Sequence, residues 1–415
     1  MWIEILHKKG VNVMDAKTWK DLLIRNDSKI VFLIMDGLGG LPMSNGTKTE
    51  LETAKTPNFD QFAKEGICGL LDPIYPGFTP GSGPAHLALF GYEPVEFNIG
   101  RGVLSALGVD FELTHRDVAA RLNFCTIDKN GIITDRRAGR IATELNQKLC
   151  DKIQKTVKLP GDVEFFIRTE SEHRAVLILR GDGLGGDIND TDPQEVGKKP
   201  LDPKGNGFES EKAADLVREF LKQVKEILKD EHPADFILAR GFAKHEVFPD
   251  MEKRYGLHSL AIAQYPMYRG LARLVGMTVP PVPKTYDDMW NQLKENFDKF
   301  DFFFIHFKKT DSYGEDGNFE AKVKMIETVD SWSKNLRELH PDVLIITGDH
   351  STPALLKSHS WHPVPVLLWS KYTRPDGVTE FGECYCREGY IGRMPMKNII
   401  LIAMANAHRF KKFGA

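Results

Sequence analysis

Four nearly unbroken apolar runs stand out in the pattern of hydrophobic and polar positions along the chain. They are IVFLIM at 30–35, FDFFFIHF at 300–307, VLIIT at 343–347 and PVLLW at 365–369. Such runs are typical of strands buried on both faces, as in a parallel sheet. Residues 318–339 instead repeat apolar positions at spacings of three and four, which predicts a helix. Strands that alternate with helices indicate a doubly wound, mostly parallel α/β sheet.

Residues 95–277 have a different pattern, in which short strand-like pieces precede one long helical stretch. The pieces and the helix cover residues 117–128, 131–135, 163–170, 173–181 and 209–229. This order predicts a second domain, of α+β type. The loop 181–210 is rich in Gly, Asp and Pro, and its length indicates a function or mobility.

Candidate metal ligands, described below, lie on both sides of this region, so we expect it to be inserted into the first domain. The expected division is a discontinuous metal-binding α/β domain of residues 29–94 and 278–415, an inserted substrate domain of residues 95–277, and an N-terminal extension of residues 1–28. Within the extension, residues 15–27 predict a short amphipathic helix with Asp15 as its cap.

Composition narrows the choice of function. The formal net charge is −3 over 415 residues, which argues against a nucleic-acid partner, because nucleic-acid-binding surfaces are basic. No apolar run approaches the ~18 residues of a membrane span, so we expect no membrane partner. The five cysteines are few and odd in number, which favours reduced thiols in a cytoplasmic protein.

Acidic residues follow three of the predicted strands. They are Asp36, Asp311 and Asp349, the last directly before His350 and ten residues before His359. Ligands bind beyond the carboxyl ends of strands in open α/β sheets. Three acids aimed into one crevice repel each other unless a cation neutralises them. Each acid alone could cap a helix, but all three together with the histidines favour a metal site.

The segment TPGSGPAH at 79–86 adds a candidate nucleophile. Pro80 and Gly81 predict a turn, and Pro84 suits the first position of a helix, where amide N–H groups can bind phosphate. Ser82 is then either an N-cap residue or a nucleophile, which metal coordination can activate. The segment is neither a G-x-S-x-G elbow nor a P-loop.

Several spaced motifs resemble a single enzyme family. They are Asp36, GSGPAHLALFGYEP (81–94), GRGVLSALG (100–108), DRRAGRI (135–141), DTDP (190–193), GLARLVGM (270–277), GDHSTP (348–353) and HSWHPVPVLL (359–368). Together they are similar to the archaeal-type cofactor-independent phosphoglycerate mutases of the alkaline phosphatase superfamily. The resemblance runs from about residue 29 to the C-terminus. It implies that the protein interconverts 3-phosphoglycerate and 2-phosphoglycerate, in glycolysis or gluconeogenesis, through a phosphoserine at a two-metal site.

The resemblance also implies which residues hold the two divalent cations. Carried over by motif, the first set is Asp36, Ser82, Asp349 and His350, and the second is Asp311, Glu315 and His359. Relatives usually have His at the position of Glu315. A carboxylate there favours Mn²⁺ or Mg²⁺ over Zn²⁺, with Co²⁺ as a further candidate. Glu315 could instead mark a weakened site that His362 completes, although the simpler interpretation places His362 at the surface or behind the ligands without contact to a metal.

The inserted domain is expected to bind phosphoglycerate. Arg136, Arg137 and Arg140 cluster three guanidinium groups in DRRAGR, and arginine pairs bidentately with carboxylate and phosphate. The alternative is a solvated charged turn. The resemblance adds, more weakly, the residues His173, Arg174, Asp190, Asp192 and Arg240.

The sequence DGLGG occurs twice, at 36–40 and at 182–186. We interpret the first copy as part of the metal crevice and the second as a turn near the substrate without a metal role. Two rival functions stay open: a metal-dependent phosphohydrolase or mutase of another phospho-ester or phosphonate, and a non-catalytic relative that binds phosphoglycerate. The sequence indicates no oligomeric state.

Overall fold

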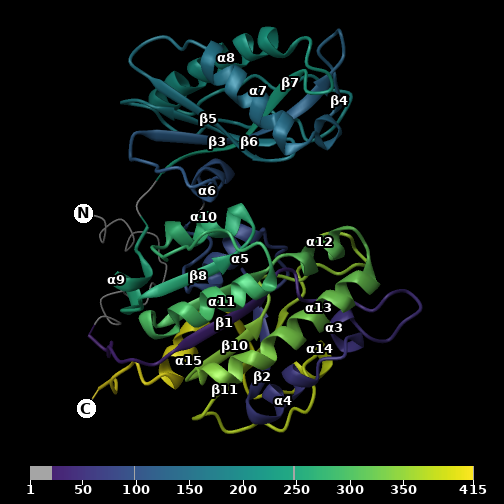
Figure 1. Ribbon diagram of the computed structural model, residues 1–415, viewed down its shortest axis with the longest axis vertical. Helices are drawn as coiled ribbons and strands as arrows, with labels where there is room; N and C mark the ends of the chain where they lie inside the picture. Colours follow the sequence, from purple (N-terminus) through teal and green to yellow (C-terminus); the bar gives the residue numbers. More distant parts are fainter. Residues whose placement is uncertain (1–20, 98, 246–247, 415) are drawn as a thin grey trace. The chain divides into compact units, whose positions relative to one another are not determined.

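A computed structural model of the chain describes residues 21–97, 99–245 and 248–414, and the chain divides into two compact units (Figure 1). The first unit consists of Met1–Phe97, Pro249–Gln264 and Val275–Ala415, and the second of Asn98–Phe248 and Tyr265–Leu274. Among the helices of the described ranges, none is long and apolar enough to cross a membrane.

The first unit is built on a mostly parallel sheet, with seven strands in the described residues. Across the sheet they are β12 (Gly392–Pro395), β2 (Ile67–Asp72), β11 (Val364–Ser370), β10 (Val343–Thr347), β1 (Ile30–Met35), β9 (Phe302–Phe307) and β8 (Ser259–Ala263). The neighbours β10, β1, β9 and β8 run parallel, and every one of their residues is buried. The predicted α/β fold with a mostly parallel sheet is therefore confirmed.

The direction of β11 differs from the expectation for its apolar run. The strand pairs antiparallel with both β10 and β2, although six of its seven residues are buried. Burial on both faces produces an unbroken apolar run, and burial does not depend on strand direction. The run alone therefore predicts a central strand but not how it points.

Helices cover the sheet of the first unit. They are α3 (Glu50–Thr53), α4 (Pro57–Glu65), α5 (Ser82–Leu89), α9 (Met251–Tyr255), α11 (Tyr286–Asn296), α12 (Lys309–Glu315), α13 (Phe319–Ser333), α14 (Glu383–Cys386) and α15 (Ile399–Asn406). Of these, α4 and α14 contact β11, α11 contacts β8, α12 contacts β1 and α15 contacts β10. The helix predicted over 318–339 is α13, continued by a 3₁₀ turn at Lys334–Leu339.

The helix expected over residues 15–27 is wrong where it can be compared. Residues 15–20 lie outside the described residues, and residues 21–27 form no helix. Leu23 makes an antiparallel bridge with Phe410, and the N–H of Ile24 donates to the carbonyl of Arg409. Pairing with the C-terminal segment satisfies backbone N–H and C=O groups that helical hydrogen bonds would otherwise have satisfied.

The second unit is an antiparallel sheet covered by helices. Its strands in sheet order are β4 (Ile133–Asp135), β3 (Asp117–Ile127), β6 (Arg174–Arg180) and β5 (Glu164–Ser171), with β7 (Phe236–Lys244) also paired to β3. Its helices are α6 (Arg101–Gly108), α7 (Thr143–Thr156), α8 (Phe208–Leu228) and α10 (Pro266–Leu274). The strand-like pieces predicted between 117 and 181 correspond to β3–β6, and the long predicted helix is α8.

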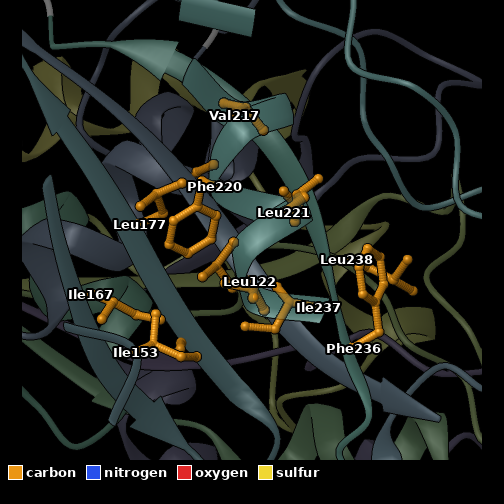
Figure 2. Close-up of a cluster of buried hydrophobic side chains, with 14 of the residues drawn as sticks. Leu122, Ile153, Ile167, Leu177, Val217, Phe220, Leu221, Phe236, Ile237 and Leu238 are labelled. Atoms are coloured by element: carbon orange, nitrogen blue, oxygen red, sulfur yellow. The ribbon is translucent and has the colours of Figure 1, made fainter. Parts of the chain in front are cut away.

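The core of the second unit lies between α7, α8 and the sheet (Figure 2). Phe220 of α8 is fully buried in the same cluster as Leu122 of β3 and Leu177 of β6, and Ile153 of α7 joins them. Burying a side chain of this size contributes about 1.5–3 kcal/mol. The helix-period pattern of 209–229 is therefore explained by one apolar face turned to the sheet.

The boundary expected between the domains at residue 277 needs correction. Pro249–Gln264 belongs to the first unit, because β8 pairs in parallel with β9 and forms the end of that sheet. Helix α10 belongs to the second unit, where it packs against α6. The chain therefore passes between the units more often than a single insertion requires.

Candidate active site

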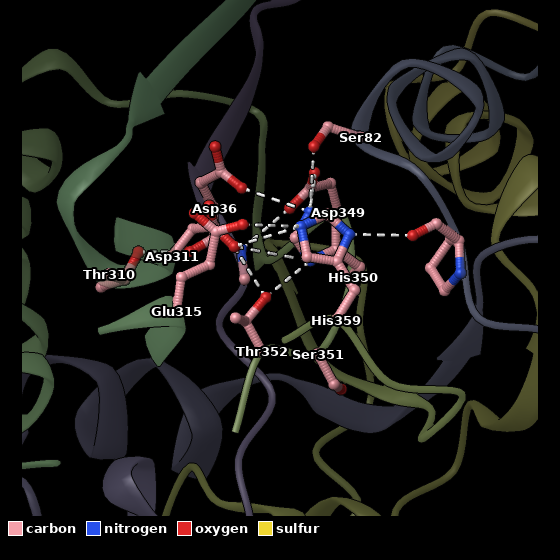
Figure 3. A network of polar contacts seen from close by, with 12 residues as sticks. Asp36, Ser82, Thr310, Asp311, Glu315, Asp349, His350, Ser351, Thr352 and His359 are labelled. Carbon is pink, nitrogen blue, oxygen red and sulfur yellow. Dashed lines mark hydrogen bonds and ion pairs between the residues drawn. The ribbon is translucent and has the colours of Figure 1, made fainter. Parts of the chain in front are cut away.

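The carboxyl ends of three neighbouring strands bring the expected acids to one edge of the first sheet. The register pairs the last residues of β1 with those of β9 and β10. Asp36 follows β1, Asp349 follows β10, and Asp311 lies in α12, which starts after β9. Figure 3 shows these side chains gathered in one polar network.

One group of side chains centres on the imidazole of His350. Its Nε2 lies 3.0 Å from Asp349 Oδ2, 3.4 Å from Asp36 Oδ1 and 3.3 Å from Ser82 Oγ. The two carboxylates and the imidazole are fully buried, and one ligand atom of each lies within 4.8 Å of the others. The N–H of Gly37 fixes the second oxygen of Asp349 with a 3.0 Å hydrogen bond.

A second group lies beside the first and shares His350 with it. Asp311, His350 and His359 each place one ligand atom within 4.8 Å of the others. His359 Nε2 is 3.5 Å from Asp311 Oδ1 and 3.9 Å from Glu315 Oε1, and its Nδ1 contacts the carbonyl of Pro80 at 2.9 Å. The rings of His350 and His359 stack with centroids 3.7 Å apart.

Glu315 and His362 differ in their relation to this group. Glu315 is the last residue of α12 and its side chain is 55% exposed, so it stands at the rim with its carboxylate toward His359. His362 contacts the hydroxyl of Ser360 at 3.0 Å and stacks on Trp361. Of the two, Glu315 is the residue whose charged atoms approach His359.

Ser82 is the first residue of α5, and Gly81 is its N-cap. The helix therefore starts two residues before Pro84, whereas the sequence predicts Pro84 at the first helical position. Proline is tolerated in a first turn because the amides there have no helical acceptor. His86, one turn further along α5, contacts the carbonyl of Ser82 at 2.9 Å and Asp349 at 3.2 Å. The hydroxyl of Ser82 is thus held beside His350 at the start of a helix.

The charges of the first group fit a cation. Both carboxylate oxygens of Asp36 and Oδ2 of Asp349 are buried and accept no hydrogen bond of ordinary geometry from the described residues. They face nitrogen atoms at 3.0–3.5 Å instead. Burial opposes charge on the His350 ring, yet Asp349 and Asp36 raise its pKa to about 9. Burial and Asp349 raise the pKa of Asp36, but Lys308 and His306 outweigh them and the pKa falls to about 2.

Several residues of the site were not predicted from the sequence. Lys308 places its ammonium 3.0 Å from Asp36 Oδ2 and also pairs with Asp311. The hydroxyl of Thr352 contacts both Asp311 Oδ1 at 2.7 Å and His350 Nδ1 at 2.9 Å. A lysine directly after a strand whose neighbours end in acids was a usable signal. Nothing in the sequence marked Thr352.

The arginines expected to bind substrate fall into two groups in the second unit. Arg136 donates two hydrogen bonds to Asp192, 2.9 Å to Oδ1 and 2.7 Å to Oδ2. Arg240 lies 3.5 Å from Asp192 and 3.6 Å from Asp190. Its bidentate pair with Asp192 sets Arg136 apart from its neighbours in DRRAGR.

The other group surrounds His173, which is 1% exposed. Burial lowers the pKa of His173 to about 4, together with the nearby guanidinium groups of Arg174, Arg137, Arg121 and Arg140. Arg174 also donates to the hydroxyl of Tyr265 at 3.3 Å. Arg121 was missed because it sits within β3, in a stretch whose pattern predicted only a strand. The group presents several positive charges around a neutral imidazole.

The second DGLGG repeats the backbone of the first but not its chemistry. Gly37 and Gly183 have φ of +63° and +66°, so both copies turn through the left-handed region that favours glycine. Asp182, however, is 83% exposed in its side chain and pairs with Arg116. This copy is a surface turn.

Comparisons with known proteins agree on one family. The family model described as "2,3-bisphosphoglycerate-independent phosphoglycerate mutase" matches residues 63–234. A protein of Aquifex aeolicus described as "Probable 2,3-bisphosphoglycerate-independent phosphoglycerate mutase" is 48% identical over 403 residues, covering 95% of this chain and 99% of the relative.

Two solved structures are also similar to most of the chain. A protein from Pyrococcus horikoshii is 30% identical with a TM-score of 0.80, covering 94% of this chain and 100% of that chain. The cofactor-independent phosphoglycerate mutase from Thermoplasma acidophilum is 27% identical with a TM-score of 0.67, covering 92% of this chain and 99% of that chain. These similarities span both units.

Proposed function

The chain belongs to the family of 2,3-bisphosphoglycerate-independent phosphoglycerate mutases, which are isomerases, and we propose that it interconverts 3-phosphoglycerate and 2-phosphoglycerate through a phosphoserine at Ser82. The observation that carries the proposal is the place of this hydroxyl: at the first residue of α5 and 3.3 Å from His350. Family membership supports the mutase activity, while the route through Ser82 rests on this geometry.

We assign two divalent cations to the two groups of ligands. Asp36, Ser82, Asp349 and His350 would hold one, and Asp311, His359 and Glu315 the other. The buried oxygens of Asp36 and Asp349 support the first assignment, since a cation would satisfy them. With three carboxylates and a fourth at the rim, the oxygen-rich set favours Mn²⁺ or Mg²⁺ over Zn²⁺ or Co²⁺. When bound, such cations supply positive charge that lowers the pKa of a serine hydroxyl and neutralises phosphoryl oxygens.

The proposed reaction has two balanced transfers. Ser82 loses its proton and its Oγ forms a bond to phosphorus, while the bond from phosphorus to O3 of the substrate breaks and O3 takes up a proton. The O2 hydroxyl of the same glycerate then loses its proton and forms a bond to phosphorus, while the bond from phosphorus to Ser82 Oγ breaks and Oγ takes up a proton, which regenerates the free serine. The N–H groups of the first turn of α5 would donate to the phosphoryl oxygens and stabilise their charge.

We assign recognition of glycerate to the arginines around His173. Arg137, Arg140 and Arg174 offer planar, charged donors that match a carboxylate bidentately. The neutral imidazole of His173 can accept or donate a hydrogen bond without adding charge. Arg136, Asp192 and Arg240 would support this group rather than contact the substrate, because their charged atoms already pair with one another.

The test is Ser82→Ala, with Ser331→Ala as control. Ser331 is exposed on α13, and within the described residues its hydroxyl donates to the carbonyl of Glu327 in its own helix. We expect Ser82→Ala to lose at least nine-tenths of 3-phosphoglycerate mutase activity in an enolase-coupled assay, and to lose the phosphopeptide that mass spectrometry finds in the quenched wild-type enzyme. Retained activity in Ser82→Ala would overturn the phosphoserine route. Release of inorganic phosphate without 2-phosphoglycerate in the wild type would point to a phosphohydrolase.

A further inference from the structure

A fully buried lysine lies behind the candidate metal centre. Lys322 of α13 has no exposed surface, and its ammonium donates to two backbone carbonyls, those of Gly39 at 3.0 Å and Thr352 at 2.8 Å. Gly39 follows β1 in the loop that begins at Asp36. Thr352 follows β10 in the loop that begins at Asp349. A single ammonium therefore joins the two loops that carry Asp36, Asp349 and His350.

A buried glutamate makes the complementary contacts to the same two loops. Glu50 also has no exposed surface, and its Oε1 lies 3.7 Å from the ammonium of Lys322. Its carboxylate accepts hydrogen bonds from the N–H of Leu41 at 3.2 Å and from the N–H of Ala354 at 2.7 Å. The lysine thus fixes carbonyls and the glutamate fixes amides, one of each in either loop.

The pair reaches the ligands through Thr352. While its carbonyl accepts from Lys322, its hydroxyl contacts Asp311 Oδ1 and His350 Nδ1. Asp311 belongs to one ligand group, and His350 to both. A shift of the Thr352 backbone would therefore disturb contacts to both ligand groups at the same time.

We propose that the buried Lys322–Glu50 pair is a positioning device for the metal centre, holding the loops after β1 and β10 in the spacing that the cations require. The proposal rests on the two-cation assignment above. A buried ion pair contributes little net stability compared with apolar side chains of the same volume. Partners that orient ligands from behind typically change metal affinity by about 10–100-fold when they are removed. The main effect of Lys322 should therefore be on metal binding.

The experiment compares Lys322→Met with Lys324→Met in metal-stripped full-length protein. Lys324 lies on the same helix and is 78% exposed, and within the described residues its ammonium pairs with Glu327 at 3.0 Å. Isothermal titration with Mn²⁺ should show affinity weakened about 10–100-fold in Lys322→Met and unchanged within twofold in Lys324→Met. Urea unfolding of the same metal-free samples separates a change of affinity from a loss of fold.

Lys322→Met alone leaves the buried carboxylate of Glu50 without its lysine, which can itself impair folding. The double variant Lys322→Met/Glu50→Leu removes both charges and so avoids this defect. It should fold as well as the wild type or better, and still bind Mn²⁺ at least tenfold more weakly. Affinity equal to that of the wild type in either folded variant would overturn the positioning role. If the wild-type protein itself binds no Mn²⁺ but interconverts the phosphoglycerates, the metal assignment fails and the inference falls with it, whereas the mutase activity stands.

Discussion

Replacing the same glycine in the two copies of DGLGG separates a backbone requirement from a packing requirement. Gly37 has φ of +63° and Gly183 has φ of +66°, so alanine meets the same conformational penalty at both positions. A Cβ on Gly37 would lie 2.6 Å from Thr352 Oγ1 and 2.8 Å from Asp311 Oδ1. A Cβ on Gly183 would meet only Lys212 Nζ, at 3.7 Å. The two variants therefore form a matched pair.

The expected losses of stability follow from these contacts. An L-residue in the left-handed region costs roughly 1–2 kcal/mol, which is the whole expected effect of Gly183→Ala. Overpacking a tightly filled site costs about 1–3 kcal/mol more. The free energy of unfolding should thus fall by about 2–5 kcal/mol in Gly37→Ala. Since the displaced atoms belong to Asp311 and its partner Thr352, Mn²⁺ affinity should also fall at least about tenfold.

Urea unfolding of both variants and titration with Mn²⁺ would measure the two effects. The informative quantity is the difference between the variants, because the backbone term is common to them. Equal losses of stability together with wild-type Mn²⁺ affinity in Gly37→Ala would refute the reasoning. That result would mean that the loop after β1 accommodates the added Cβ by a small backbone shift, and that the contacts of Gly37 do not set the position of Asp311.

Three further predictions concern the rim, the arginines and a partly buried acid. Glu315→His should shift reconstitution of the metal-free enzyme from Mn²⁺ toward Zn²⁺, because imidazole suits Zn²⁺; an unchanged ratio of the two activities would remove Glu315 from the ligand set. Arg136→Ala should lower the free energy of unfolding measured in urea by about 3 kcal/mol, because it removes two hydrogen bonds from buried Asp192. Arg140 is exposed, so Arg140→Ala should change stability by less than about 0.5 kcal/mol but raise the KM for 3-phosphoglycerate. Burial raises the pKa of Glu383 from 4.5 to about 7, so ionisation costs the folded state more free energy than the unfolded state. Between pH 5 and 8 the free energy of unfolding of the wild type should therefore fall by about 2 kcal/mol relative to that of Glu383→Gln. Parallel pH profiles of unfolding for the two proteins would contradict this.

The central strands of the first unit were predictable because burial on both faces produces an unbroken apolar run in the sequence. The runs at 30–35 and 343–347 match β1 and β10 residue for residue. Strand β8 (SLAIA) escaped notice because it is short and built of small residues, so the boundary between the units was misplaced. The failed helix at 21–27 shows the limit of a local pattern: pairing of Leu23 with Phe410 involves residues far away in the sequence.

The acids of the site were predictable for a different reason. An acid directly after a buried strand is visible in the sequence, and the topology of an open α/β sheet brings such positions together. The residues that hold those acids in place were not visible. Thr352 and Lys322 look like an ordinary loop residue and an ordinary helix residue, and only the close approach of two loops gives them a role. Positioning residues are set by tertiary contacts, so they carry no local signature.

The balance of charge at the edge of the first sheet links these observations to the proposed chemistry. Asp36, Asp311 and Asp349 are buried together, and in the described residues Lys308 offsets part of their charge by pairing with the first two. Two divalent cations would more than neutralise the remaining carboxylates, including that of Glu315. The site would then carry a net positive charge, which suits a doubly charged phosphoryl group. A neutral histidine at position 315 would make the site more positive, so on the proposed route Glu315 would also limit how tightly the phosphoryl group is held between its two transfers.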